Sequence, residues 1–230
     1  MDIATFFDGM LNGMSFGTMM GLLGQGFVLS AEIFAVTLIG SLPLGVVVAL
    51  CRMSKVKLIS RIAQFYISIL RGTPLMLQLM AIMFGPYYLF GISISSNWKY
   101  VACAIGFILN YSAYFAEIYR SGIQSIPPGQ YEAAQVLGYS RWQTFMKIVF
   151  PQVLKRIMPA MGNEVITLVK DTSLAFVLGL MEMFNQAKAV AASQVSMMPY
   201  LVAALIYWGF SLLVEWLLRR AEAKMDYYHD

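Results

Sequence analysis

Long apolar runs constrain the fold of this chain more than any other feature of its sequence. Runs from about Gly24 to Leu50, from about Tyr100 to Tyr119 and from about Tyr200 to Leu218 approach or exceed the roughly 20 residues that a helix needs to cross a bilayer. Hydrophobic residues make up 59% of the chain and charged residues 12%, whereas about a quarter of a soluble domain is charged. The sequence therefore predicts an all-α integral membrane protein.

Lysines and arginines gather at the ends of the apolar runs. Arg52, Lys55, Lys57 and Arg61 follow the first run, and the last run ends in RRAEAK. Because cytoplasmic loops of membrane proteins carry an excess of cations, these clusters predict five crossings with the N-terminus outside and the C-terminus in the cytoplasm. The net charge of +4 is then explained by topology, and we expect a lipid membrane rather than nucleic acid as the partner.

Two of the predicted passages are interrupted. RGTP, at residues 71–74, divides the apolar stretch 62–90, and its glycine and proline should break or bend the helix. The run 157–169 has only about 13 residues, or about 20 Å of helix, which cannot cross a hydrocarbon core of roughly 30 Å. KDTS follows, and a second apolar segment covers 174–184. We interpret 157–184 as one passage that is broken at membrane depth.

Polar side chains surround this second break. They are Asn163, Glu164, Lys170, Asp171, Thr172 and Ser173. An ionised group at the bilayer centre costs about 2.5–3.5 kcal/mol on insertion scales, so such groups usually pair or face a wet cavity, and transporters bind substrate at broken helices near the midplane. A helix starting near Thr172 would offer free N–H groups to a carboxylate, and Glu164 or Asp171 would meet an ammonium group. The alternative is a structural ion pair made by Lys170 with Glu164 or Asp171.

Two further charged residues are candidates for a substrate pathway. Glu117 precedes Arg120 by three residues, and this spacing also suits a simple ion pair on a helix surface. Arg71 stands beside the glycine–proline break, where it would line the pathway or extend toward the lipid headgroups.

The segment PPGQYEAAQVLGYSRWQTFMKIVFP, at residues 127–151, is too polar for the membrane. It predicts a Pro-Pro-Gly turn followed by two short cytoplasmic helices. Gly138 is a candidate to end the first helix, and Ser140 is a candidate cap for the second. Small residues at helical spacing would let a partner approach closely. A hairpin without a partner is the alternative.

Motifs of enzyme chemistry are missing from the sequence. It contains no GxxxxGK[ST], HExxH, GxSxG or CxxC pattern, and its single histidine is His229 near the C-terminus. We therefore expect neither an enzyme nor a metal or cofactor bound by this chain.

The polar segment resembles the EAA loop of ABC-importer permease subunits. The residues that match are Glu132, Ala133, Ala134, Gly138, Ile148 and Pro151, while Phe150 stands where the family pattern has leucine. RGTPLMLQ (71–78), AEIYRSGIQSIPPGQ (116–130) and GNEVITLVKDTSL (162–174) also resemble the polar amino acid branch, the histidine, glutamine and arginine type.

This resemblance covers about residues 24–220 and implies a five-helix core of the type I importer fold. The chain would be a single transmembrane permease domain, 1–230, with an N-terminal lead-in (1–23) and a coupling loop (130–151). It would pair with a second copy or a paralogue in a prokaryotic plasma membrane. ABC ATPase subunits, which bind ATP and Mg, and an extracytoplasmic substrate-binding protein would complete the transporter.

The resemblance also assigns roles to individual residues. Glu132 would be the polar contact to the ATPase, Ala133, Ala134 and Gly138 would give the close approach and the turn, and Ile148 and Pro151 belong to the same coupling loop. The expected function is ATP-driven, binding-protein-dependent import of polar amino acids, with ATP hydrolysis by the partner. An ion-coupled secondary amino acid transporter is the alternative, although it would not need a docking hairpin.

Overall fold

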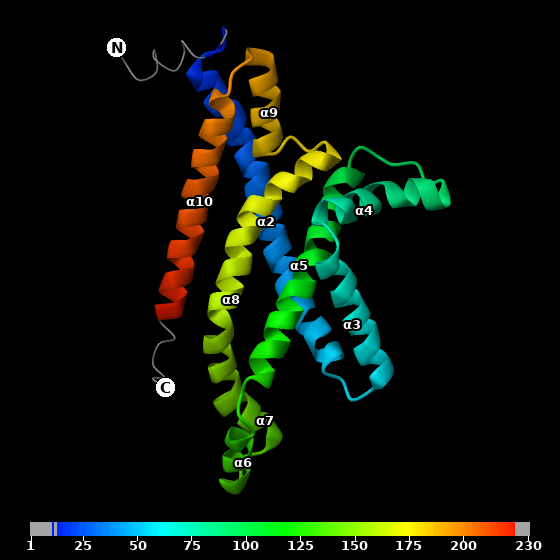
Figure 1. Ribbon diagram of the computed structural model, residues 1–230, viewed down its shortest axis with the longest axis vertical. Helices are drawn as coiled ribbons and strands as arrows, with labels where there is room; N and C mark the ends of the chain where they lie inside the picture. The colour runs from blue at the N-terminus through cyan, green and yellow to red at the C-terminus, as the bar shows by residue number, and fades with distance from the viewer. Residues whose placement is uncertain (1–10, 12, 224–230) are drawn as a thin grey trace. The chain divides into compact units, whose positions relative to one another are not determined.

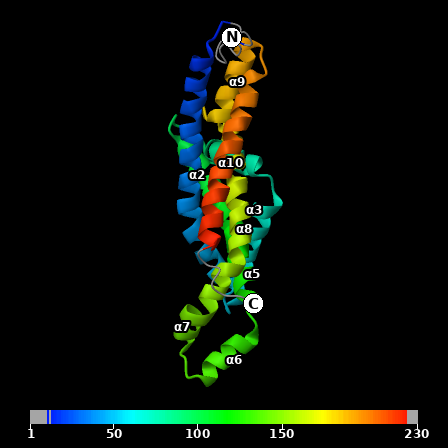
Figure 2. The same ribbon diagram turned by 90° about the vertical axis from the view of Figure 1, so that its left-hand side faces the viewer.

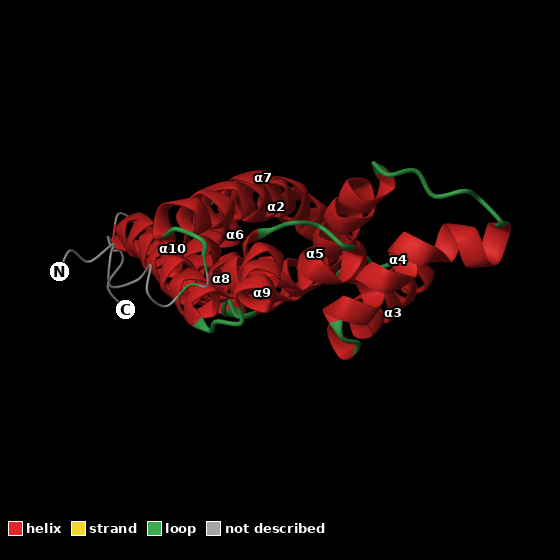
Figure 3. Ribbon diagram, turned by 90° about the horizontal axis from the view of Figure 1, so that it is seen from above, coloured by secondary structure: helices red, strands yellow, loops and turns green. Residues whose placement is uncertain are grey.

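The computed structural model describes residue 11 and residues 13–223, and all regular structure in these residues is helical (Figures 1 and 3). The α-helices are α2 (Phe16–Arg52), α3 (Lys57–Gly72), α4 (Leu75–Phe90), α5 (Trp98–Gln124), α6 (Pro128–Val136), α7 (Arg141–Thr144), α8 (Phe150–Asp171), α9 (Met183–Gln194) and α10 (Met198–Ala223). A π-helical turn, η1 (Phe145–Val149), joins α7 to α8, and a 3₁₀ helix, η2 (Thr172–Leu178), follows α8. The prediction of an all-α fold is confirmed.

Three helices, α2, α5 and α10, are long and apolar enough to cross a membrane, and α3 with α4 makes a fourth passage if the bent pair counts as one. The first helix begins at Phe16 instead of near Gly24, and it continues through Pro43 to Arg52. The expected boundary between the lead-in and the core at residues 23 and 24 therefore lies inside a continuous helix.

The break expected at RGTP is confirmed. Helices α3 and α4 are bent by 109° relative to each other at this point. Thr73 is extended, with φ −121° and ψ 149°, because a residue that precedes proline avoids the helical region. Pro74 then occupies the position directly before α4 and is also extended, with φ −61° and ψ 131°.

The break expected at KDTS is not found, and this prediction is wrong. Helix α8 has 22 residues, about 33 Å at 1.5 Å per residue, and it runs straight into η2 because Asp171 keeps a helical conformation. The helical path ends at Gly179, whose φ is 70°, and the next helix begins at Met183. Thr172 is the first residue of η2, but no gap in the helical path separates it from α8. The apolar run 157–169 begins directly after Lys155 and Arg156. Lysine and arginine are good helix formers, so α8 includes both residues and begins earlier, at Phe150.

The chain divides into two compact units. The first unit comprises Met1–Leu38, Pro74–Phe107 and Ile166–Val214, and the second comprises Ile39–Thr73, Ile108–Val165 and Glu215–Asp230. Helices α2, α5, α8 and α10 contribute to both units.

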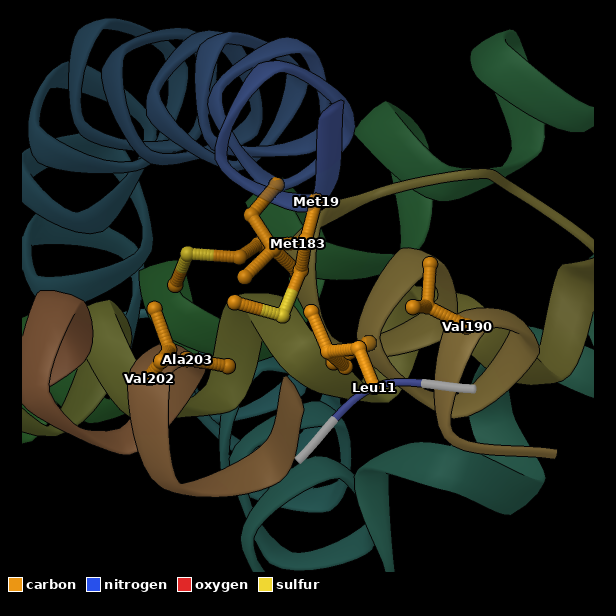
Figure 4. Packing of buried hydrophobic residues seen from close by; sticks show 8 residues of the cluster. Leu11, Met19, Met183, Val190, Val202 and Ala203 are labelled. Carbon is orange, nitrogen blue, oxygen red and sulfur yellow. The ribbon is translucent and has the colours of Figure 1, made fainter. Parts of the chain in front are cut away.

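An apolar cluster holds the first unit together. Its buried members come from α2 and the residues before it, from α9 and from α10: Leu11, Met19, Leu23, Met183, Ala187, Val190, Val202 and Ala203. Figure 4 shows Met19 and Met183 side by side at the centre of this cluster. Methionine suits such positions because its flexible thioether fills irregular gaps.

A close approach of α2 to the backbone of Met183 requires glycine at position 26. A Cβ atom at Gly26 would lie 2.7 Å from the Met183 Cα atom and 2.8 Å from its nitrogen. Backbone atoms cannot move aside as a flexible side chain would, so the helix and the start of α9 would have to separate.

We expect Gly26→Ala to destabilise the protein although alanine favours helix by about 1 kcal/mol. Overpacking costs about 1–3 kcal/mol, and each kcal/mol lowers Tm by about 2–4 °C in a chain of this size. The measurement is the Tm of the detergent-solubilised protein. Gly24→Ala is the matched control, since a Cβ atom there meets nothing within 4 Å. Equal Tm values for the two variants would contradict the close approach.

Two clusters hold the second unit together. Ala49, Ile67, Ala113 and Ala116 bring α2, α3 and α5 together. The other cluster has members before, within and after the polar segment: Ile126, Val149, Val153 and Ile157. A Cβ atom at Gly122 would collide with the Ile157 side chain, so α5 and α8 are in close contact beside the hairpin.

Candidate functional site

Helices α6 and α7 form the short hairpin that the sequence predicted (Figure 2). Pro128 is the first residue of α6, a position where the missing proline N–H is not needed. Gly138 follows the end of α6 with φ 78°, and the N–H of Tyr139 donates to the Ala134 carbonyl at 3.0 Å. A left-handed glycine therefore ends this helix, as expected.

The start of α7 is also as predicted. The Ser140 hydroxyl accepts the N–H of Gln143 at 3.3 Å, and the Gln143 side chain accepts the N–H of Ser140 at 2.9 Å. This reciprocal arrangement is a capping box. The turn between the two helices is thus fixed at both ends by local hydrogen bonds.

The residues of the coupling loop differ in exposure. Glu132, Ala133 and Gly138 are exposed, Ile148 and Pro151 are half-buried, and Ala134 is fully buried. Ala134 therefore has no surface to offer a partner, contrary to the expectation, because α6 packs against α7 and η1. Its small side chain serves the close packing of the hairpin itself.

Sequence reasoning missed an apolar surface on this hairpin. Val136 is 88% exposed, Leu137 73% and Trp142 70%, and all three lie at or near the turn. Apolar side chains grouped on a polar hairpin indicate a protein interface. The signal in the sequence was the pair Val136–Leu137 directly before the glycine that turns the chain.

The hairpin is attached firmly to the long helices beside it. Arg156 of α8 donates to the Ser125 carbonyl and, at 3.2 Å, to the Ser125 hydroxyl. Gln152 donates to the Gln130 side chain at 3.3 Å. With the apolar cluster of α5, η1 and α8, these bonds let a movement of the hairpin act directly on α8.

A cavity of about 540 Å³ lies in the first unit, between the end of α8, the start of η2, α9 and α10. Its lining residues are Ile166, Lys170, Ser173, Phe184, Tyr200, Ala203, Ala204, Tyr207, Trp208 and Ser211. Among these, Lys170 is the single charged residue and four are aromatic. The cavity thus combines one cation and a few hydroxyl groups with mainly apolar and aromatic walls.

Two of the predicted pathway residues, Lys170 and Ser173, line this cavity. They lie four and seven residues after Ile166, so an uninterrupted helical path presents all three on one face. The remaining four are not among the lining residues. Asn163 is exposed and Glu164 half-buried on α8, Asp171 is half-buried, and Thr172 is buried with its hydroxyl bonded to the Val169 carbonyl at 2.8 Å.

The two weaker candidates also lie elsewhere. Glu117 accepts from the Arg120 Nε atom at 3.0 Å, which is the helix-surface ion pair considered for it. The Arg71 guanidinium lies 5.2 Å from the centre of the Tyr114 ring, a cation–π contact. Both residues belong to the second unit, and neither lines the cavity.

Sequence reasoning missed the aromatic walls of the cavity and a buried acidic residue, Glu182, just before α9. The walls come from α9 and α10, and no local pattern connects these helices with KDTS. Glu182 carried a usable signal, because a carboxylate inside an apolar stretch is costly and therefore rarely without a role.

The helical passages, the hairpin and the cavity together describe a membrane transport component. The chain belongs to the family of binding-protein-dependent transport system inner membrane components, whose model matches residues 41–227.

Individual relatives agree with this membership. The chain is 38% identical over 202 residues to the arginine transport system permease protein ArtQ of Bacillus subtilis (strain 168), a match that covers 87% of this chain and 91% of the relative. It is 37% identical over 197 residues to the L-cystine transport system permease protein TcyL of the same organism, with 84% and 82% covered. A crystal structure of an amino acid ABC transporter with histidines matches with a TM-score of 0.82 and 32% identity, covering 93% of this chain and 100% of that chain.

Proposed function

We propose that this chain is the membrane subunit of an ATP-driven, binding-protein-dependent importer of polar amino acids. The observation that carries the proposal is the continuous helical path from Arg141 to Leu178. One end of this path belongs to a hairpin with exposed apolar side chains, and residues near its other end line the cavity. The proposal thus assigns the two ends of one helical path to a docking surface and to a candidate substrate site.

The hairpin is the proposed docking site for a cytoplasmic ABC ATPase. Val136, Leu137 and Trp142 would fill an apolar groove of that partner, and exposed Glu132 would make a polar contact at its rim. ATP and Mg would be bound by the partner and not by this chain. Closure of an ATPase pair would move the hairpin and, through α8, re-pack the helices between two states.

The cavity is the proposed substrate site. Lys170 would pair with the carboxylate of an amino acid. The Ser173 hydroxyl, which donates to the Lys170 carbonyl at 2.7 Å, would accept a hydrogen bond from the substrate. The relatives named for arginine and for L-cystine differ by one percentage point in identity to this chain, so sequence similarity supports the class of substrate and no single amino acid. Asn163, Glu164, Asp171 and Thr172 would flank the route to the cavity.

The surrounding assembly follows from the same function. An extracytoplasmic binding protein would deliver the substrate, and a second copy of the chain or a paralogue would complete the pore. The cation clusters after α2 and at the end of α10 support a cytoplasmic C-terminus and an outside N-terminus in a prokaryotic plasma membrane.

The test is uptake of labelled amino acids into liposomes that hold this chain and its ATPase, with the binding protein outside and ATP inside. We expect uptake of polar amino acids with ATP and none without it. A non-hydrolysable ATP analogue provides the control. Uptake driven by a sodium or proton gradient in the absence of ATP would contradict the proposal and identify a secondary transporter.

A further inference from the structure

Glu182 is an acidic residue whose side chain is completely buried in the first unit (0% exposed). Its Oε1 atom accepts the N–H of Asn185 at 2.7 Å. Its Oε2 atom accepts the N–H of Phe184 at 2.7 Å and the hydroxyl of Tyr207 at 3.1 Å. Both carboxylate oxygens are therefore bonded, as a buried carboxylate requires.

Capping of α9 explains two of these three bonds. A helix start needs an acceptor for its first N–H groups, and serine, threonine, aspartate or asparagine usually provide it. The third bond reaches a tyrosine on α10, 25 residues further along the chain. The carboxylate thus does more than cap a helix, because it also fixes a side chain on another element.

Helix α2 is tied to the same point. The N–H of Met183 donates to the Ser30 hydroxyl at 3.3 Å, and Gly26 permits the backbone of α2 to approach Met183. The dipeptide Glu182–Met183 therefore connects three helices, α2, α9 and α10, at one buried position.

Both groups that bind the Oε2 atom of Glu182 belong to cavity residues. Phe184 and Tyr207 are two of the four aromatic residues that line the cavity, whereas Glu182 does not line it. The Oε2 atom of Glu182 accepts both the Tyr207 hydroxyl and the Phe184 N–H. This shared acceptor, which lies outside the cavity lining, therefore fixes the distance between the Tyr207 wall and the Phe184 wall.

We propose that Glu182 is a positioning residue that sets the width of the cavity for its substrate through Tyr207 and Phe184. The inference rests on the proposed role of the cavity as the substrate site. Loss of this bond removes the tie between the Tyr207 hydroxyl and the oxygen that also binds the Phe184 N–H, and the two walls no longer hold one spacing. Substrate then binds more weakly although no group that contacts it has lost its charge.

The test compares Tyr207→Phe, Glu182→Gln and the double variant in the reconstituted importer. We expect the apparent KM for uptake to rise about tenfold in Tyr207→Phe, the size of one lost bond to a charged group, with the maximal rate within about twofold of wild type. The double variant should lose less than the sum of the two single losses, because Glu182→Gln exchanges the charged acceptor of this bond for a neutral one and Tyr207→Phe removes the donor of the same bond.

Tyr66→Phe is the matched control. It also removes the hydrogen-bonded hydroxyl of a half-buried tyrosine, whose partners are the Leu109 carbonyl at 2.9 Å and the Ser112 hydroxyl at 2.7 Å, but Tyr66 is not among the cavity residues. We expect it to lower Tm and leave KM unchanged. A Tyr207→Phe variant that behaves in the same way would reduce Glu182 to a structural residue and overturn the proposal.

Two further outcomes are informative. If the Glu182→Gln protein fails to assemble into the importer, the KM of Tyr207→Phe alone tests the positioning role, since this variant leaves the cap of α9 intact. If Lys170→Met impairs uptake while Tyr207→Phe leaves KM unchanged, the positioning role fails and the substrate site stands. If neither change affects uptake, the cavity is not the substrate site.

Discussion

Gly138→Glu will leave the protein in the membrane, fail to retain the ATPase and reduce ATP-driven uptake more than tenfold. The backbone penalty alone is small, since a left-handed conformation costs a non-glycine residue about 1–2 kcal/mol, against a typical stability of about 5–15 kcal/mol. A Cβ atom at Gly138 meets nothing within 4 Å in this chain. The large effect must therefore arise at the partner, where a residue central to an interface contributes about 2 kcal/mol or more, or more than tenfold in affinity.

The measurement is co-purification of the ATPase with the membrane subunit, followed by uptake in liposomes. Gly129→Glu is the control, because it adds the same charge to the first turn of α6, where a Cβ atom also meets open space and an acidic residue suits the helix start. We expect this control to retain the ATPase. Retention by Gly138→Glu together with full uptake would show that the hairpin turn is not the docking site.

Lys170→Met will reduce uptake about 10- to 100-fold while the ATPase still co-purifies. Methionine keeps the length of the side chain and removes its charge, so the carboxylate of the substrate loses a hydrogen bond worth about 1.5–3 kcal/mol, which corresponds to that range. The hairpin is not altered, and docking of the ATPase should not change. Uptake at subsaturating substrate is the measurement, because an affinity change appears there first.

Lys188→Met is the matched control for this change. Lys188 is an exposed lysine of α9 whose ammonium group lies 5.3 Å from the centre of the Phe176 ring, and it does not line the cavity. We expect normal uptake from this variant. Equal losses in the two variants would indicate a general effect of positive charge, and wild-type uptake by Lys170→Met would remove the lysine from the substrate site.

The hairpin could be predicted in detail because its determinants are local. Gly138 ends one helix through its own backbone conformation, and Ser140 caps the next through a partner three residues away. Such interactions involve residues that are close together in the sequence, so a short sequence pattern is enough to predict them. The exposed apolar patch is harder to predict from the sequence. Apolar side chains are expected to point inward, and only the packing of α6 shows that these do not.

The path of α8 could not be predicted from hydropathy. The ends of an apolar run predict the ends of a helix only where charges stop the helix, but helix α8 carries five charged residues: Lys155, Arg156, Glu164, Lys170 and Asp171. Hydropathy reports the surroundings that a segment prefers, whereas helix formation depends on backbone propensity, which these residues do not oppose strongly.

The cavity walls and the role of Glu182 were out of reach for a different reason. Tyr207 and Phe184 are brought together by the packing of α9 on α10, and 25 residues separate Glu182 from its tyrosine partner. No periodicity within one helix encodes a contact over that distance. The sequence alone singled out Lys170 and Ser173, which line the cavity, because charged and polar residues in an apolar setting are unusual wherever the helix ends.

The π-helical turn η1, between the hairpin and α8, has a consequence for engineering. A π turn closes its hydrogen bonds one residue later than an α turn does, so it changes the angular phase of every side chain that follows it. The direction in which Val153 and Ile157 of α8 point relative to the hairpin thus depends on the five residues of this turn, Phe145–Val149. A chimaera that receives the hairpin of another transporter should therefore be joined before Phe145, so that the π-helical turn of this chain is kept together with its own α8.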